Sequence, residues 1–190
     1  MSRRAPGKVV PSSGGTTVQA LRNALQDLVG DSVFQAAMAS LRPDLREQFE
    51  PVSPLTWVPV DVIHTCVARI AEHAGRPFDE LMDAGVEKAG EKTLRTAWRM
   101  LLRVTADRAL VRRAPVLYSK WRNIGRLEVR GASDGRVELH LVEWPGMDER
   151  SVRTLGITIG TVMRLAGRKQ VRVQSASTAD GAKYNVTWQS

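Results

Sequence analysis

Histidine and cysteine are the side chains best suited to acid–base, nucleophilic or metal chemistry near neutral pH, and the chain has only four of them. His64, His73 and His140 lie far apart in the sequence, and no two have the i, i+4 spacing of a helical ligand pair. Cys66 follows His64 by two positions, and side chains at that spacing on a helix do not face each other. No nucleophile elbow or zinc motif occurs. We therefore predict no catalytic residues, no metal site and no cofactor, with a haem ligand at His64 as the alternative.

Aromatic side chains offer a second kind of site, a pocket for an apolar small molecule. The sequence has five tryptophans. Trp98 and Trp121, together with Tyr118, could line such a pocket. The alternative is that they are ordinary core anchors, because each can bury a large area.

Positive charge is concentrated in the second half of the chain. Residues 91–190 carry 19 Lys and Arg against 9 Asp and Glu, a balance of +10, within a net charge of +8 for the whole chain. This asymmetry favours a basic surface for a polyanion or an acidic partner, although it also suits a solvated Arg-rich surface. The candidate patch consists of Arg95, Arg99, Arg103, Arg112, Arg113, Lys120 and Arg122.

The elements that would position these residues fall into two groups along the chain. Residues 1–17 are rich in Gly, Ser, Pro and Arg, and we expect a disordered basic tail. Residues 18–190 are expected to form a single α+β domain that begins with a helical region. Apolar residues at helical spacing predict helices over 17–30, 32–41, 60–74, 78–89, 90–104 and 105–111, with an extended, proline-rich connection over 50–59.

The period of the apolar residues then changes from 3.6 to 2. Two predicted hairpins, one turning at Asp134-Gly135 and the other near Asp180-Gly181, flank a helix that runs from an N-cap at Asp148 to about Ala166. We predict a four-stranded antiparallel sheet in β-β-α-β-β order, with one apolar face and one wet face.

The cysteine content and the apolar stretches of the chain indicate the cellular compartment of the protein. Cys66 is the only cysteine, so the chain has no internal disulfide to suggest an oxidising compartment. Neither a signal peptide nor a stretch of about 20 apolar residues is present, and we expect a cytoplasmic protein.

Several motifs resemble an uncharacterised paralogous family that is abundant in myxobacteria. The resemblance covers about residues 18–189 and implies no activity. The matching motifs are Leu21-Arg22-Asn23-Ala24-Leu25, Trp57-Val58-Pro59, Arg99-Met100-Leu101-Leu102-Arg103, Gly125-Arg126-Leu127-Glu128, Trp144-Pro145-Gly146-Met147, Gly160, Leu165-Ala166-Gly167-Arg168, Val171-Arg172-Val173 and Asp180-Gly181.

More distantly, helices followed by hairpin–helix–hairpin look like the four-vinyl-reductase type of ligand-binding domain. That fold is shared with haem-based nitric-oxide sensors and a Golgi-tethering component. The resemblance implies ligand sensing or dimeric scaffolding, although this chain lacks the cysteine cluster that binds zinc in some four-vinyl-reductase domains.

These observations together predict a non-enzymatic sensor or adaptor module. It would bind a small apolar ligand or an unidentified protein partner, and it would self-associate as a homodimer. The alternative is a basic adaptor for nucleic acid or another polyanion.

Overall fold

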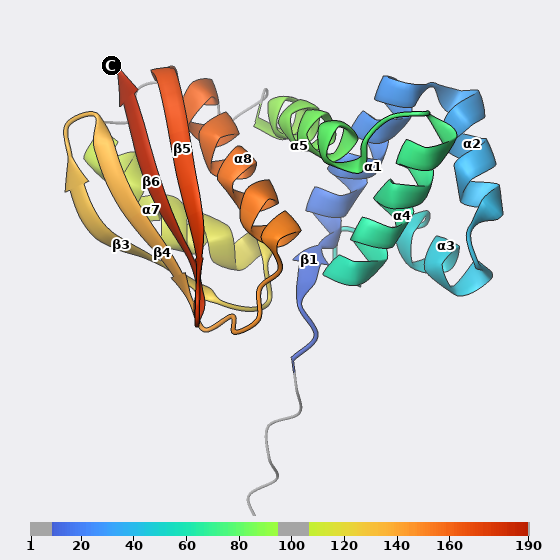
Figure 1. Cartoon of the computed structure of the whole chain (residues 1–190), viewed down its shortest axis with the longest axis horizontal. Helices are drawn as coiled ribbons and strands as arrows, with labels where there is room; N and C mark the ends of the chain where they lie inside the picture. The colour runs from blue at the N-terminus through green and yellow to red at the C-terminus, as the bar shows by residue number, and fades with distance from the viewer. Residues whose placement is uncertain (1–8, 95–106, 190) are drawn as a thin grey trace, which may run out of the picture.

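The computed structural model describes residues 9–94 and 107–189, which form seven helices and six strands (Figure 1). In chain order the elements are β1 (Ser12–Gly14), α1 (Gly15–Val29), α2 (Asp31–Ser40), α3 (Pro43–Phe49), β2 (Trp57–Pro59), α4 (Val60–His73), α5 (Phe78–Leu94), α7 (Asp107–Trp121), β3 (Arg126–Ser133), β4 (Arg136–Val142), α8 (Glu149–Leu165), β5 (Lys169–Thr178) and β6 (Gly181–Gln189). No described helix is long and apolar enough to cross a membrane.

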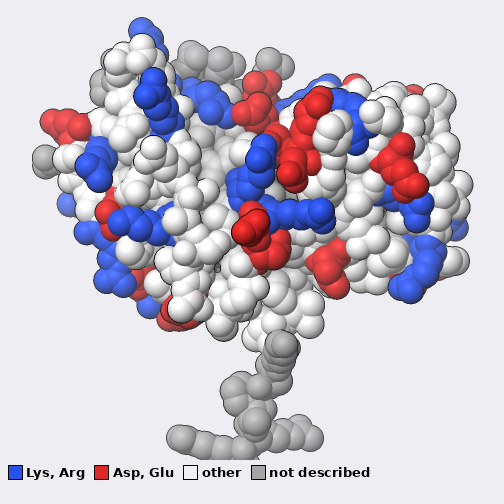
Figure 2. All heavy atoms as spheres, in the orientation of Figure 1, with Lys and Arg blue, Asp and Glu red and all other residues white. Residues whose placement is uncertain are grey.

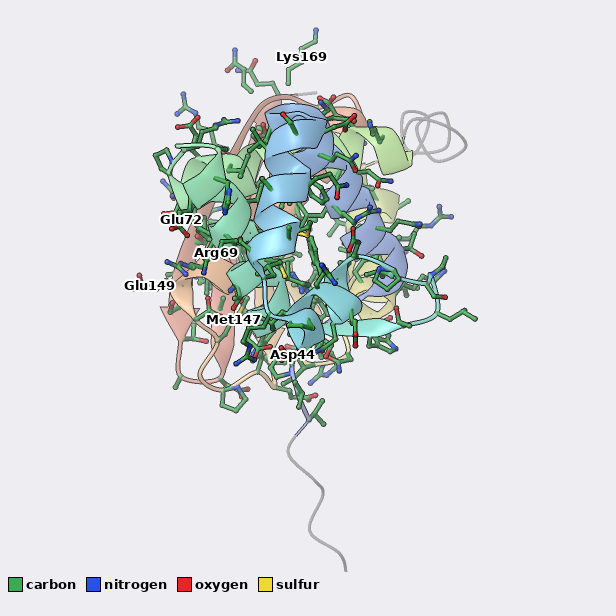
Figure 3. All side chains as sticks on the ribbon, turned by 90° about the vertical axis from the view of Figure 1, so that its right-hand side faces the viewer. Asp44, Arg69, Glu72, Met147, Glu149 and Lys169 are labelled. Atoms are coloured by element: carbon green, nitrogen blue, oxygen red, sulfur yellow. The ribbon has the colours of Figure 1, made fainter. Side chains whose placement is uncertain are left out.

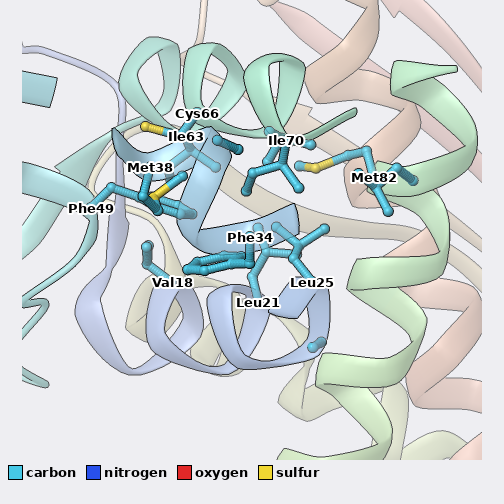
Figure 4. Packing of buried hydrophobic residues seen from close by; sticks show 14 of the residues in the cluster. Val18, Leu21, Leu25, Phe34, Met38, Phe49, Ile63, Cys66, Ile70 and Met82 are labelled. Carbon is cyan, nitrogen blue, oxygen red and sulfur yellow. The ribbon is translucent and has the colours of Figure 1, made fainter. Parts of the chain in front are cut away.

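The first half is a helical unit, α1–α5, with its own apolar core. Phe34, which is fully buried, lies between the apolar faces of α1 and α4 (Figure 4). These faces exist because apolar residues recur at helical spacing, as in Ile63, Val67 and Ile70 on α4. Figure 3 views this helical unit from its outer side, where Arg69 and Glu72 pair at 2.8 Å.

The second half is an antiparallel sheet with strand order β3-β4-β6-β5, and α7 and α8 pack on one of its faces. Alternation places Leu139, Tyr184 and Val186 on the covered face, where they are at most 3% exposed. The side chain of Asp148 begins α8 by accepting a hydrogen bond from the Ser151 backbone N–H at 2.9 Å. These residues form a second apolar core, distinct from that of the helical unit.

Helix α8 lies between the sheet and the helical unit and contacts α5 directly. Arg164 donates to Glu87 at 2.6 Å, and Arg153 pairs with Asp83, so two ion pairs join these helices across the boundary. Figure 2 shows positive and negative side chains side by side in the middle of this face. Such exposed pairs contribute only up to about 1 kcal/mol each, so they orient the halves more than they hold them together.

The α+β class, the two C-terminal hairpins and the capped helix are confirmed. The predicted β-β-α-β-β order, with all strands in one sheet after a helical region, is not matched, because β1 and β2 pair antiparallel in a second sheet within the helical half. Strands of three residues are too short to show an alternating apolar pattern, and these two lie more than 40 residues apart in the sequence. The predicted tail boundary at residue 17 also differs, since β1 occupies 12–14 and α1 begins at Gly15, whereas residues 1–8 lie outside the described part.

Three helix predictions need correction. Helix α3 is absent from the predicted helices, although Pro43 suits a first helical turn, where the missing N–H of proline costs no hydrogen bond. Residues 78–94 form one continuous helix instead of two. Helix α7 runs through Pro115 to Trp121, and the buried residues on both sides of the proline, Val111 and Tyr118, offset the lost backbone hydrogen bond by packing.

Candidate functional site

A cavity of about 110 Å³, which we call the interlayer cavity, lies where the helical unit meets the second half. Its walls come from α1, α4, α5 and α8 and from the residues that end and follow α7. Most of the wall is apolar, with Leu21, Ile63 and Val86 from three helices of the first half. The interlayer cavity is therefore bounded by residues of both cores, such as Leu21 of the first and Val60 of the second.

Hydroxyl groups line one side of the interlayer cavity. Thr154, Thr158 and Thr161 follow one another at helical spacing on α8, and Thr17 joins them from α1. The Thr158 hydroxyl donates to the Thr154 carbonyl at 2.9 Å, and the Thr161 hydroxyl accepts from Arg164 at 3.1 Å. Within the described part of the chain, the hydroxyls of Thr17 and Thr154 make no hydrogen bond and remain available to a ligand.

Arg122 also lines the interlayer cavity, just after the end of α7. Its backbone N–H donates to the Tyr118 carbonyl at 3.0 Å, and it forms an isolated antiparallel bridge with Ser13. The next residue, Asn123, accepts from the Ser12 backbone N–H at 2.7 Å and donates to the Val10 carbonyl at 2.9 Å. The N-terminal strand therefore fixes the backbone at Arg122.

Two basic side chains, His64 and Arg122, line the interlayer cavity. Burial lowers the pKa of His64, and the positive charges of Arg122 and Arg150 lower it further, against the opposing effect of Asp148. Burial also lowers the pKa of Arg122, although a guanidinium stays charged at neutral pH. The His64 ring packs edge-on against Phe78, with 5.9 Å between ring centroids. The cavity thus has a neutral imidazole and a charged guanidinium.

A smaller cavity of about 60 Å³ lies between α7, α8 and the sheet. Tyr118 and Trp121, two of the three residues predicted to line an apolar pocket, both lie in its wall. The Tyr118 hydroxyl is engaged, since it donates to the Ile124 carbonyl at 2.7 Å. Trp121, Thr158 and Val162 line both cavities, which are therefore neighbours. The third predicted residue, Trp98, lies outside the described residues.

The predicted basic patch is only partly described. Arg112, Arg113 and Lys120 are exposed on α7, whereas Arg122 is half-buried and lines the interlayer cavity instead. The remaining members, Arg95, Arg99 and Arg103, lie outside the described residues. Sequence reasoning assigned Arg122 to the patch by its charge, and it missed the threonines of α8, whose i, i+4, i+7 spacing was a signal for one polar helix face.

The side chains best suited to acid–base, nucleophilic or metal chemistry lie in separate parts of the described structure. Over 9–94 and 107–189, no three His, Cys, Asp or Glu side chains gather where they could hold a metal ion. Cys66 is buried in the core of the helical unit, and burial raises the pKa of its thiol to about 12. His73 contacts the Ser40 hydroxyl at 3.1 Å on the surface, and the half-buried His140 contacts Glu138 at 2.7 Å.

No protein-family model and no curated protein matches this chain. Solved structures of H-NOX proteins are similar to it in fold. A doubly substituted Tt H-NOX has a TM-score of 0.68 and 14% identity, over 93% of this chain and 95% of that one. An oxygen-binding H-NOX domain related to soluble guanylate cyclases has a TM-score of 0.66 and 14% identity, over 93% and 95%. An Fe(II) unliganded H-NOX protein from K. algicida has a TM-score of 0.66 and 7% identity, over 93% and 97%.

Proposed function

We propose that this chain is a non-enzymatic sensor module that binds a small molecule in the interlayer cavity. The observation that carries the proposal is the position of this cavity, between two independent cores that are joined by surface ion pairs. A ligand there would contact both halves at once, so it would favour the relative arrangement of the halves that it binds best. The fold similarity to an oxygen-binding H-NOX domain supports the same interpretation, because that protein also binds a small molecule.

The fold raises the question of haem, because one similar structure concerns the modulation of heme redox potential by protein-induced porphyrin distortion. The described residues do not fit that group. An apolar cavity of about 150 Å³ holds a single benzene ring, and the interlayer cavity is smaller, at about 110 Å³. His64 is the one described histidine in its wall, and its ring packs against Phe78 beside the charged Arg122. We therefore propose a ligand other than haem.

Native mass spectrometry of protein purified from its own host tests the proposal directly. The expected result is an excess over the denatured mass that corresponds to a bound small molecule. Val162→Phe adds a ring where the two cavities adjoin, and it should abolish the excess while the circular dichroism spectrum is unchanged. Val116→Phe adds the same ring at an exposed position of α7, so it should retain the ligand. A wild-type protein without bound mass, or a Val162→Phe protein that retains it, would contradict the proposal.

A sensor must pass its signal to another molecule, and we propose that a protein partner or a second copy of the chain binds it for this purpose. Light scattering with and without the released molecule tests self-association. A monomer in both states would exclude the second copy and leave a different protein as the partner.

A basic adaptor is the second candidate. The exposed Arg112, Arg113 and Lys120 on α7 form no ion pair with any described residue, so their charge is open to a polyanion. Binding to DNA or RNA should then weaken steeply as salt rises, because counterions are released on binding. Binding that does not respond to salt would exclude this electrostatic mechanism.

A further inference from the structure

The large hydrophobic side chains that are exposed come from three short segments of the chain. Within residues 9–94 and 107–189 they are Val9 and Val10 before β1, Leu55 and Trp57 at the beginning of β2, and Val116 on α7. Leu55 is 91% exposed, so it makes almost no contact with the rest of the protein. Single exposed apolar residues are ordinary, but a group of them on one surface indicates an interaction site.

The short strand β1 joins these three segments. It pairs with β2, where Gly14 lies opposite Trp57. A Cβ atom at residue 14 would lie 3.2 Å from the Lys120 carbonyl oxygen and 3.8 Å from the Cζ3 atom of Trp57, so the tryptophan ring and the last turn of α7 meet at this glycine. The Asn123 side chain donates to the Val10 carbonyl at 2.9 Å. We call the exposed surface around this strand the β1 surface, and its apolar members are Val9, Val10, Leu55, Trp57 and Val116.

The β1 surface is basic as well as apolar. Arg113, Val116 and Lys120 follow one another at i, i+3 and i+7 on α7, so two exposed basic side chains flank the valine on one helix face. The segments 9–14, 53–60 and 113–123 contain no Asp or Glu. Asp61, which comes next after β2 and Val60, lies in the first turn of α4, where the positive end of the helix dipole offsets part of its charge.

From this combination we propose that the β1 surface binds to an anionic lipid bilayer, with Leu55 and Trp57 in the interfacial layer and Arg113 and Lys120 against the headgroups. Tryptophan is enriched at the level of the headgroups, and each basic residue near an anionic membrane adds to the attraction. A leucine that is almost free of protein contacts can enter the acyl boundary, whereas a protein partner would need a pocket shaped to receive it. Phosphate groups of a nucleic acid would attract the basic residues but not the leucine. Membrane binding of this kind goes beyond the proposed function, because it needs no ligand in the interlayer cavity.

Flotation of the full chain with vesicles tests this proposal. Wild type should float with vesicles of phosphatidylcholine and phosphatidylglycerol in equal parts and much less with phosphatidylcholine alone, and added salt should weaken the binding. Leu55→Ser should raise the lipid concentration for half-maximal binding by about 10- to 100-fold, and it should fold like wild type because Leu55 is so exposed. Lys120→Gln should raise that concentration by about fivefold. Lys169→Gln is the matched control and should leave it unchanged, because Lys169 is exposed at the top of the molecule and β1 lies near its base (Figure 3, Figure 1).

A gain of binding complements these losses. Val116→Phe enlarges the apolar part of the β1 surface and should bind anionic vesicles more tightly than wild type, with an unchanged circular dichroism spectrum. Wild type that does not float with anionic vesicles would overturn the proposal. Binding that Lys120→Gln weakens and Leu55→Ser leaves unchanged would also overturn it, because the surface would then attract polyanions by charge alone. A wild type that ignores vesicles but forms a dimer that Leu55→Ser disrupts would make the β1 surface an interface between two copies of the chain instead.

Discussion

Helices α5 and α8 approach each other closely at Gly90, which makes their packing testable with one methyl group. A Cβ atom at residue 90 would lie 2.9 Å from the Cγ2 atom of Thr161, closer than real Cβ contacts. Thr161 is 4% exposed, and a β-branched side chain on a helix has few alternative rotamers. In Gly90→Ala the two helices must therefore move apart, at the edge of the interlayer cavity.

The magnitude follows from two opposing effects. Overpacking of this kind destabilises by about 1–3 kcal/mol, whereas replacing glycine by alanine inside a helix stabilises by about 1 kcal/mol. The net loss for Gly90→Ala is therefore about 0–2 kcal/mol. In a Thr161→Ser background the clashing methyl is absent, while the hydroxyl that accepts from Arg164 remains. There Gly90→Ala should stabilise by about 1 kcal/mol, which gives a coupling free energy of about 1–3 kcal/mol.

Urea unfolding of the four proteins of this cycle, followed by circular dichroism, measures the coupling. Gly85→Ala on the same helix is the matched control. Its Cβ would meet the methyl ends of Leu25 and Leu21 at 2.9 and 3.0 Å, and such flexible ends can move aside. It should show no coupling to Thr161→Ser. If Gly90→Ala has the same effect in both Thr161 backgrounds, α5 and α8 are not in this contact, and the position of the cavity wall is wrong.

Three further predictions concern titration and capping. Because burial lowers the pKa of His64, the folded state resists its protonation, so wild-type stability should decrease as pH falls below about 6.5. In urea unfolding at pH 5–8, His64→Gln should remove this loss of stability, whereas the control His73→Gln should retain it. An unchanged pH profile in His64→Gln would contradict the assignment. Burial raises the pKa of the Cys66 thiol to about 12, so a thiol reagent at pH 8 should modify it only at the rate of unfolding, and fast modification of folded protein would refute its burial. Asp148→Ala should lower the unfolding free energy by about 0.5–2 kcal/mol, because the N-cap of α8 is lost. Burial raises the Asp148 pKa, but hydrogen bonds from Ser151 outweigh it and lower the pKa overall, so the difference from wild type should persist above about pH 4 and shrink as the wild-type carboxylate is protonated. A difference that is the same at pH 3 and pH 7 would show that the carboxylate charge has no role in the cap.

The C-terminal half could be predicted from the sequence because its signals are local. Alternating residues define both faces of a strand, the Asp134-Gly135 pair supplies a tight turn, and Asp148 stands at the start of a helical stripe. Each of these features depends on residues within about ten positions of each other. The fold class therefore followed without knowledge of long-range contacts.

The site could not be predicted in the same way, because it is made by packing between distant segments. Thr17, His64 and Thr154 lie on three different helices and Arg122 follows a fourth, and only tertiary structure brings them to one cavity. Tyr118 and Trp121 are predicted pocket residues because they are aromatic and near each other in the sequence, and both line the smaller cavity. The environment of Arg122 depends on β1, more than 100 residues earlier in the chain.

Fold and chemistry therefore make separate contributions to the proposed function. The fold brings two cores together and leaves space at their boundary. The fold itself is similar to that of an H-NOX structure at only 14% identity. Which molecule can enter this space depends on a few side chains, and two neighbours, Trp121 and Arg122, are examples. Trp121 lines both cavities, whereas its neighbour Arg122 lines only the interlayer cavity and brings a positive charge to its wall. Since β1 bridges to Arg122 and its neighbour Asn123 while also pairing with β2, a ligand that moves this arginine acts directly on the strand pair of the helical half.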